Sequence, residues 1–114
     1  MSNCLFCKFV SKEIPTQVVF EDESCVAFED IHPKAPVHTL IVPKRHIESL
    51  NAAGAQDENL LGHLLLIAQQ LARLKGVADS GYRAVINSGP DGGQSVFHVH
   101  IHLMGGRSMA WPPG

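Results

Sequence analysis

The chain lacks long apolar runs, an excess of one charge and enough cysteines for a disulfide framework. Nine Lys and Arg against eleven Asp and Glu give a formal net charge of −2, which provides no basic surface for a nucleic-acid backbone or an anionic membrane. The apolar runs are too short to cross a bilayer, and the N-terminus does not resemble a signal peptide. The three cysteines are an odd number, typical of free thiols or metal ligands. We therefore expect a cytoplasmic protein with no nucleic-acid or membrane partner.

The hydrophobic pattern predicts one domain over residues 1–114, because 45% hydrophobic residues in a chain of this length supply one core. Residues 4–10 have helical spacing, and a long amphipathic helix begins at Asp57-Glu58-Asn59 and ends at Gly76. Its apolar stripe contains Leu60, Leu61, Leu64, Leu65, Ala68, Leu71 and Ala72. Runs typical of strands occupy residues 17–21, 24–29, 38–42, 82–87 and 96–104. Turns rather than helices separate most of these runs, which indicates an α+β protein with an antiparallel meander.

The last of these runs carries three of the seven histidines. Side chains alternate between the two faces of a strand. One face would hold Phe97, Val99, Ile101 and Leu103, and the other would hold His98, His100 and His102. The apolar face would pack against the long helix, which leaves the imidazoles to line a cleft. A polar surface stripe or a zinc site are the rival interpretations, since imidazoles two residues apart converge well enough to bind metal.

A glycine-rich loop leads directly into the histidines. Gly89, Gly92 and Gly93 allow close backbone approach, and consecutive N–H groups in such a turn suit phosphate oxygens. Most loops of this kind are only hairpin turns, but this one delivers Ser95 beside the imidazoles. A neutral imidazole attacks phosphorus, with its working nitrogen set by the hydrogen bond at the other. We expect His100 to be that nucleophile, in a reaction that requires no metal.

The segment His98-Val99-His100-Ile101-His102-Leu103-Met104 resembles the His-φ-His-φ-His-φ-φ signature of the histidine triad (HIT) superfamily. Residues 28–31, 35–38, 42–46, 91–95 and 105–114 resemble its Hint branch, the histidine triad nucleotide-binding proteins. The similarity extends over essentially the whole chain. It implies a HIT-like fold, with a five-stranded antiparallel sheet, one long helix and a short N-terminal helix. It also implies a homodimer in which the two sheets join.

The resemblance implies hydrolysis of purine nucleoside phosphoramidates, such as adenosine 5′-phosphoramidate, to AMP and an amine through a nucleotidyl-histidine. His100 would be the nucleophile, and His102 and Ser95 would contact the phosphate and leaving group. His38 and His98 resemble supporting imidazoles. The nucleotide-binding residues would be Asp30 for the ribose, Ile31 for the base, and Asn87, Gly93, Gln94, Ser95, His100 and His102 for the phosphate.

Some of these residues have simpler interpretations. Asp30 is also typical of a turn, and Asn87 of a strand end that caps a loop; only the resemblance favours a binding role. His32 and His63 are expected at the surface. The tail around Trp111 either frays or docks on a neighbouring subunit.

The resemblance also indicates a structural zinc site. In several bacterial relatives a matching C-x-x-C pair and two histidines hold zinc, and the corresponding residues here are Cys4, Cys7, His46 and His98. The alternative is two reduced thiols packed in an N-terminal helix. Zinc at His98 would prevent that ring from passing protons to His100, and the supporting role would fall to backbone carbonyls and His38. Cys25 is expected to be a small buried apolar residue in a strand.

Three other functions remain open from the sequence. Dinucleoside polyphosphate hydrolysis or nucleotidyl transfer would use the same covalent intermediate with another leaving group. A purine nucleotide-binding regulatory module would bind without turnover. A metal-dependent hydrolase would use the triad as ligands.

Overall fold

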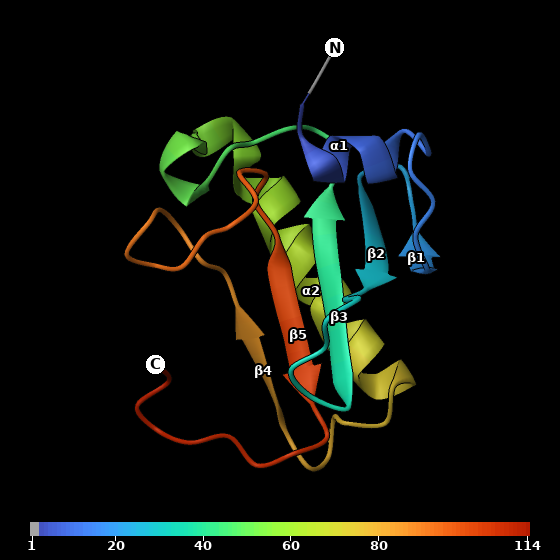
Figure 1. Cartoon of the computed structure of the whole chain (residues 1–114), viewed down its shortest axis with the longest axis vertical. Helices are drawn as coiled ribbons and strands as arrows, with labels where there is room; N and C mark the ends of the chain where they lie inside the picture. The colour runs from blue at the N-terminus through green and yellow to red at the C-terminus, as the bar shows by residue number, and fades with distance from the viewer. Residues whose placement is uncertain (1–2) are drawn as a thin grey trace.

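Five antiparallel strands form the centre of the computed structural model, which describes residues 3–114. They are β1 (Val18–Glu21), β2 (Cys25–Glu29), β3 (Val37–Pro43), β4 (Tyr82–Val85) and β5 (Ile101–Gly105). Their order in the sheet is β1-β2-β3-β5-β4 (Figure 1). The predicted α+β class and antiparallel pairing are confirmed. The predicted meander, in which each strand pairs with the next one in the sequence, is wrong at one point, because β5 lies between β3 and β4.

The strand that carries the histidines is shorter than the sequence predicted. We expected it over residues 96–104, but β5 begins at Ile101, so only His102 of the triad lies in the sheet. In the ladder with β3, Ile101 pairs with Ile41. On the N-terminal side of Ile101 the ladder with β3 ends. There the Val99 N–H instead donates to the carbonyl of Ile47 at 2.7 Å. Residues 98–100 therefore approach the sheet as an irregular segment.

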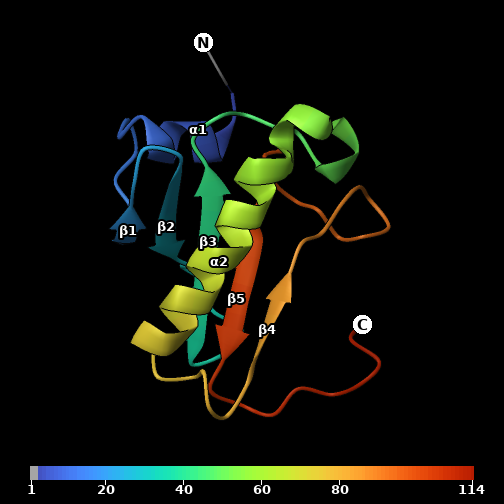
Figure 2. The same cartoon turned by 180° about the vertical axis from the view of Figure 1, so that it is seen from behind.

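The long helix α2 (Glu58–Leu74) covers one face of the sheet (Figure 2). Its start and end agree with the prediction, and Gly76 just beyond it has φ 78°, a conformation that glycine adopts without strain. The buried residues of the helix are Leu64, Ile67, Ala68, Leu71 and Ala72. They pack against Ile41, Ile101 and Leu103 in the main core. The prediction was wrong for Leu65, which is 50% exposed, while Ile67 takes a core position.

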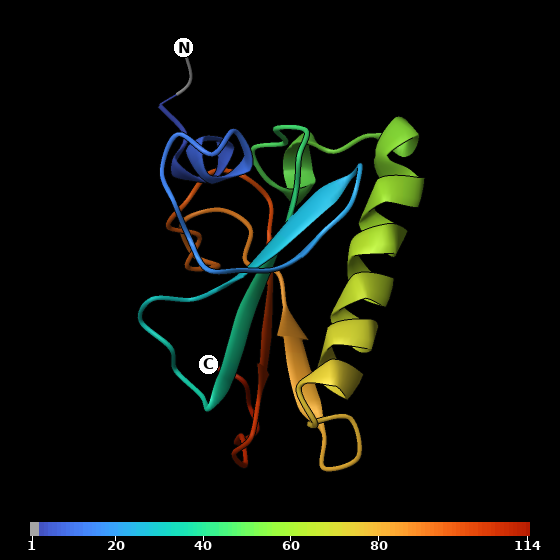
Figure 3. The same ribbon diagram turned by 90° about the vertical axis from the view of Figure 1, so that its right-hand side faces the viewer.

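The opposite face is covered at one end by the short helix α1 (Leu5–Val10), as Figure 3 shows edge-on. Phe6 of this helix packs on Phe28 of β2, with ring centroids 5.4 Å apart. Together with Val26, Leu40 and Val42 these rings form a second, smaller core. Two short 3-10 helices, η1 (Leu50–Ala52) and η2 (Ala55–Asp57), lead into α2. Within residues 3–114 no helix combines the length and apolar character needed to span a membrane.

Candidate active site

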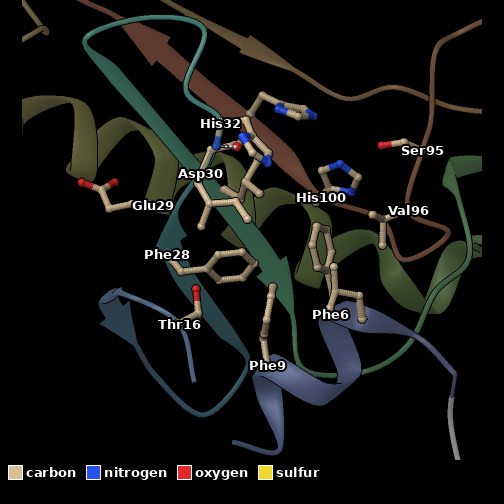
Figure 4. Close-up of a pocket in the computed structure, with 14 residues that line it drawn as sticks. Phe6, Phe9, Thr16, Phe28, Glu29, Asp30, His32, Ser95, Val96 and His100 are labelled. Atoms are coloured by element: carbon tan, nitrogen blue, oxygen red, sulfur yellow. Dashed lines mark hydrogen bonds between the residues drawn. The ribbon is translucent and has the colours of Figure 1, made fainter. Parts of the chain in front are cut away.

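A pocket opens on the face of the sheet that α2 leaves uncovered (Figure 4). Its apolar wall is formed by α1, Phe28 and Leu40, and its polar wall by Asp30, Ser95, His100 and His102. The prediction that three imidazoles line a cleft is confirmed for His100 and His102 and wrong for His98, which does not line the pocket. The predicted alternation holds for Ile101 and Leu103, which lie in the main core on the other face. Phe97 departs from the predicted pattern, since its side chain is 47% exposed.

His100 is held by the backbone of its own segment. Its Nδ1 lies 2.7 Å from the carbonyl oxygen of His98. A carbonyl only accepts, so Nδ1 carries the proton and Nε2 keeps its lone pair. Burial lowers the pKa of this imidazole below its ordinary 6.5, although the same carbonyl and Asp30 oppose the shift. At neutral pH the ring is therefore uncharged, with Nε2 in the nucleophilic form.

His102 and His38 form a chain of hydrogen bonds beside His100. The backbone N–H of Lys34 donates to His38 Nδ1 at 3.0 Å, so the remaining proton of a neutral His38 is on Nε2. That Nε2–H donates to His102 Nδ1 at 2.9 Å. Burial, with repulsion from His100 and His38, lowers the pKa of His102 to about 4. A neutral His102 consequently carries its proton on Nε2, away from His38.

Asp30 takes part in both a turn and the pocket. Its Oδ1 accepts the N–H of His32 at 2.8 Å, the pattern expected of a turn residue. Its Oδ2 lies 3.4 Å from His38 Nε2, and the side chain also lines the pocket. Ile31 beside it is 80% exposed at the rim of the pocket. The two interpretations of Asp30 are therefore compatible.

The glycine-rich loop is organised largely by internal hydrogen bonds. The N–H groups of Gly93 and Gln94 donate to the carbonyls of Pro90 and Gly89, at 3.0 and 3.1 Å. The Gln94 side chain is buried; its Oε1 accepts the Gly89 N–H, and its Nε2 donates to the carbonyls of Glu48 and Val96. The donors at Gly93 and Gln94 thus hold the loop together, and the binding of phosphate by this loop stays a prediction. Ser95 lines the pocket, whereas Asn87 and Gly93 do not.

The predicted metal ligands Cys4, Cys7, His46 and His98 meet at one end of the pocket wall. Their ligand atoms all lie within 4.8 Å of one another. His98 Nδ1 is 3.3 and 3.4 Å from the sulfurs of Cys4 and Cys7, and 3.2 Å from His46 Nδ1. A zinc tetrahedron with bonds of about 2.1 Å to nitrogen and 2.3 Å to sulfur separates its ligand atoms by roughly 3.3–3.8 Å. The donor set therefore fits zinc.

His98 is oriented for this cluster and not for proton transfer to His100. Its Nε2–H donates to the carbonyl of Pro43 at 2.8 Å, which leaves the Nδ1 lone pair facing the thiols. The ring is fully buried, and burial lowers its pKa. The backbone carbonyl of His98, in contrast, accepts the Nδ1–H of His100. Cys25 lies apart in the core as expected, and burial raises the pKa of its thiol to about 12.

Sequence reasoning missed the apolar wall of the pocket. Leu5, Phe6 and Phe9 come from α1 and meet Phe28, which lies 19 to 23 positions further along the chain. Figure 4 shows Phe6 between Phe28 and His100. The spacing of Phe6 and Phe9 placed them on one face of the predicted helix. The sequence did not indicate which surface the face with Phe6 and Phe9 would cover.

Comparisons with known proteins agree with this geometry. The HIT domain family model matches residues 11–109. An uncharacterised HIT-like protein of Synechococcus elongatus is 54% identical over 110 residues, which cover 96% of each chain. The crystal structure of a HIT family hydrolase from Legionella pneumophila is 52% identical, with a TM-score of 0.96 over 98% of this chain and 100% of that one. A HIT family hydrolase from Clostridium thermocellum is 41% identical, with a TM-score of 0.93 over 96% of each chain. The chain belongs to the HIT domain family.

Proposed function

We propose that this protein is a purine nucleoside phosphoramidate hydrolase of the Hint branch, acting through a nucleotidyl-histidine. The observation that carries the proposal is the hydrogen bond from His100 Nδ1 to the carbonyl of His98. It presents an uncharged Nε2 to a pocket that has an apolar wall for a base. Membership in a family with hydrolases supports the general reaction.

The reaction runs in two displacements. In the first, the lone pair of His100 Nε2 forms a bond to the α-phosphorus while the P–N bond breaks and its electron pair stays on nitrogen. The departing nitrogen accepts a hydrogen bond from His102 Nε2–H, takes a proton from a water molecule and leaves as an amine, so His102 stays neutral. In the second, the hydroxide left from that water attacks phosphorus, the bond between phosphorus and His100 Nε2 breaks with its electron pair returning to the nitrogen, and AMP leaves. Covalent catalysis of this kind divides one difficult displacement into two easier ones.

Substitution of the nucleophile tests this proposal. We expect His100→Ala to reduce steady-state hydrolysis of an adenosine phosphoramidate by roughly a thousandfold or more, since the covalent route is lost. Brief incubation of the native protein with labelled substrate, quenched without acid, should trap adenylate on His100. Activity within about tenfold of the native protein in His100→Ala would contradict the nucleophile assignment. Tight AMP binding without turnover would indicate a binding module instead.

The leaving group distinguishes the two enzymatic functions. An adenosine phosphoramidate and a diadenosine polyphosphate should be compared at equal concentrations of enzyme and substrate. We expect the phosphoramidate to be hydrolysed faster. Faster turnover of the polyphosphate would favour dinucleoside polyphosphate hydrolysis.

We also propose that Cys4, Cys7, His46 and His98 hold a structural zinc ion. The fit of their spacing to a tetrahedron and the direction of the His98 Nδ1 lone pair toward the two thiols support it. Bound zinc would fasten α1 to the segment that precedes β5. No step of the reaction above passes through the ion.

We further propose that the protein acts as a homodimer joined along β4. Within residues 3–114, β4 pairs on one side only, with β5, and lies at the end of the strand order. Such an edge presents unpaired backbone groups that a second copy can satisfy. Trp111 in the tail is 83% exposed, an unusual state for a large aromatic ring. Sedimentation velocity should show a dimer that removal of residues 108–114 weakens, and a monomer at all concentrations would contradict the proposal.

A further inference from the structure

The turn that follows β5 packs on the loop that precedes β3. Gly106 has φ 91°, and a Cβ atom there would lie 2.9 Å from Cβ of Pro36. Only glycine permits this close approach in this conformation. The next residue, Arg107, donates its Nε–H to the carbonyl of Lys34 at 2.8 Å. Residues 106 and 107 therefore clamp the loop of residues 33–36 at two neighbouring points.

The clamped loop supplies the donor at the head of the imidazole chain. The Lys34 N–H donates to His38 Nδ1 at 3.0 Å, and His38 Nε2–H donates to His102 Nδ1 at 2.9 Å. The carbonyl that Arg107 holds belongs to the same residue as that N–H. A neutral imidazole has one proton for two nitrogens, so an N–H fixed at one end of the chain decides the tautomer of both rings.

From this geometry we propose that Arg107 is a positioning residue for His102, acting through the Lys34 amide and His38. The guanidinium touches neither the pocket nor the triad. It holds the Lys34 segment where its N–H selects the Nε2–H tautomer of His38, and this in turn leaves the Nε2–H of His102 directed at the leaving nitrogen. Without the clamp the loop relaxes, and part of the population carries the His102 proton on Nδ1, where it cannot reach the substrate.

This inference deepens the proposed function and rests on it for its kinetic test. Moving the His102 proton from Nε2 to Nδ1 should slow the departure of a leaving group that needs protonation. It should not slow a leaving group that departs as a stable anion. For Arg107→Gln we expect kcat for an alkylamine phosphoramidate of AMP to fall about tenfold with KM unchanged. For the p-nitrophenyl ester of AMP we expect kcat within about twofold of the native value.

Arg83→Gln is the matched control. Its guanidinium also donates to a backbone carbonyl near the C-terminus, that of Ala110 at 2.8 Å, but this carbonyl is not part of the loop of residues 33–36. We expect this variant to keep native kcat on both substrates. Equal losses on the two substrates in Arg107→Gln, or the same selective loss in Arg83→Gln, would overturn the inference.

The tautomers give a readout that does not depend on turnover. Nitrogen-15 spectra of the imidazoles should show single Nε2–H forms of His38 and His102 in the native protein, and mixed forms in Arg107→Gln. Unchanged single tautomers in the variant would overturn the inference. If the native protein hydrolyses neither substrate, the proposed function fails, and the spectra alone then decide the positioning role of Arg107.

Discussion

The ring of Phe6 stands edge-on to the ring of His100, with centroids 4.9 Å apart and planes at 88°. Phe6 lies between Cys4 and Cys7 on α1, a helix of six residues. A helix this short is not stable by itself in water, so its position depends on what it packs against. The apolar wall of the pocket, His100 and the thiol cluster are thereby parts of one packed unit.

Truncation of Phe6 should weaken both packing and nucleotide binding. We expect Phe6→Ala to lower the free energy of unfolding by about 3–5 kcal/mol, because a buried ring is replaced by a cavity, and to raise KM more than it lowers kcat. Phe6→Leu should lower the free energy of unfolding and raise KM by smaller amounts. Phe97→Ala is the control, since Phe97 is 47% exposed. Chemical denaturation and AMP calorimetry provide the measurements, and an unchanged AMP affinity in Phe6→Ala would show that α1 does not contact the nucleotide.

Acid should inactivate the enzyme only below the ordinary range of histidine. Burial lowers the pKa of His100 below 6.5, and only the neutral ring is a nucleophile. We expect kcat/KM to decline in acid as the ring takes up a proton, with its half-maximal point below pH 6.5. A half-maximal point above 6.5 would mean that the free enzyme holds His100 in a more polar setting.

Burial of His102 makes the free energy of unfolding depend on pH in the acid range. His102 has a pKa of about 4 in the folded protein, against 6.5 in an exposed chain. Between these values the unfolded chain binds more protons than the folded one, so the free energy of unfolding falls as pH drops from 6.5 to about 4. Denaturant titrations across this range should show the decline, and His102→Asn should make it shallower. An equal slope in the variant would assign the effect to other groups.

Metal removal should loosen α1. We expect purified protein to contain one zinc per chain and to lose thermal stability in a chelator, because an ion that binds only the folded state stabilises it. Cys7→Ser should lower the zinc content and abolish the chelator effect. Cys25→Ala is the control, since that thiol lies in the main core and should leave the zinc content unchanged. A chelator effect that persists in Cys7→Ser would contradict the assignment of the site.

Asp22 fastens the β1–β2 turn to α2. Its Oδ1 accepts the N–H groups of Ser24 and Cys25 at 2.8 Å, and its Oδ2 accepts the His63 Nε2–H at 2.7 Å. Desolvation raises the pKa of Asp22, but these hydrogen bonds together outweigh it and lower the pKa to about 2. The stabilisation is therefore present above the ordinary pKa of 3.8 and is lost as pH falls through about 2.

Removal of that carboxylate should destabilise the protein at neutral pH. For Asp22→Ala we expect a loss of about 1–3 kcal/mol, because two backbone donors lose their acceptor. His63→Gln should cost less than Asp22→Ala, since it keeps the turn intact. Equilibrium unfolding in urea measures both. A larger loss in His63→Gln than in Asp22→Ala would mean that the contact with α2 outweighs the turn.

The sequence by itself predicted the long helix, most of the strands and a face lined by imidazoles. A repeat of two residues separated the imidazoles from Ile101 and Leu103, and a repeat of three and four residues placed α2 over the latter pair. These periodicities are local, so they survive in a single chain without any knowledge of its contacts. They did not predict that the ladder between β3 and β5 begins only at Ile101. The break depends on the hydrogen bond from the Val99 N–H to the carbonyl of Ile47, which is a contact between distant parts of the sequence.

Only the tertiary structure decided which nitrogen of each imidazole works and what surrounds it. His100 is oriented by a carbonyl two residues away, but His38 is oriented by the Lys34 amide, His98 by Pro43, and the pocket wall by α1. The first two partners are close in the sequence, but Pro43 and α1 lie on separate elements whose distance is set by packing. Either nitrogen of a neutral imidazole can carry the proton until a fixed donor or acceptor selects one, and that selection is a property of three-dimensional contacts.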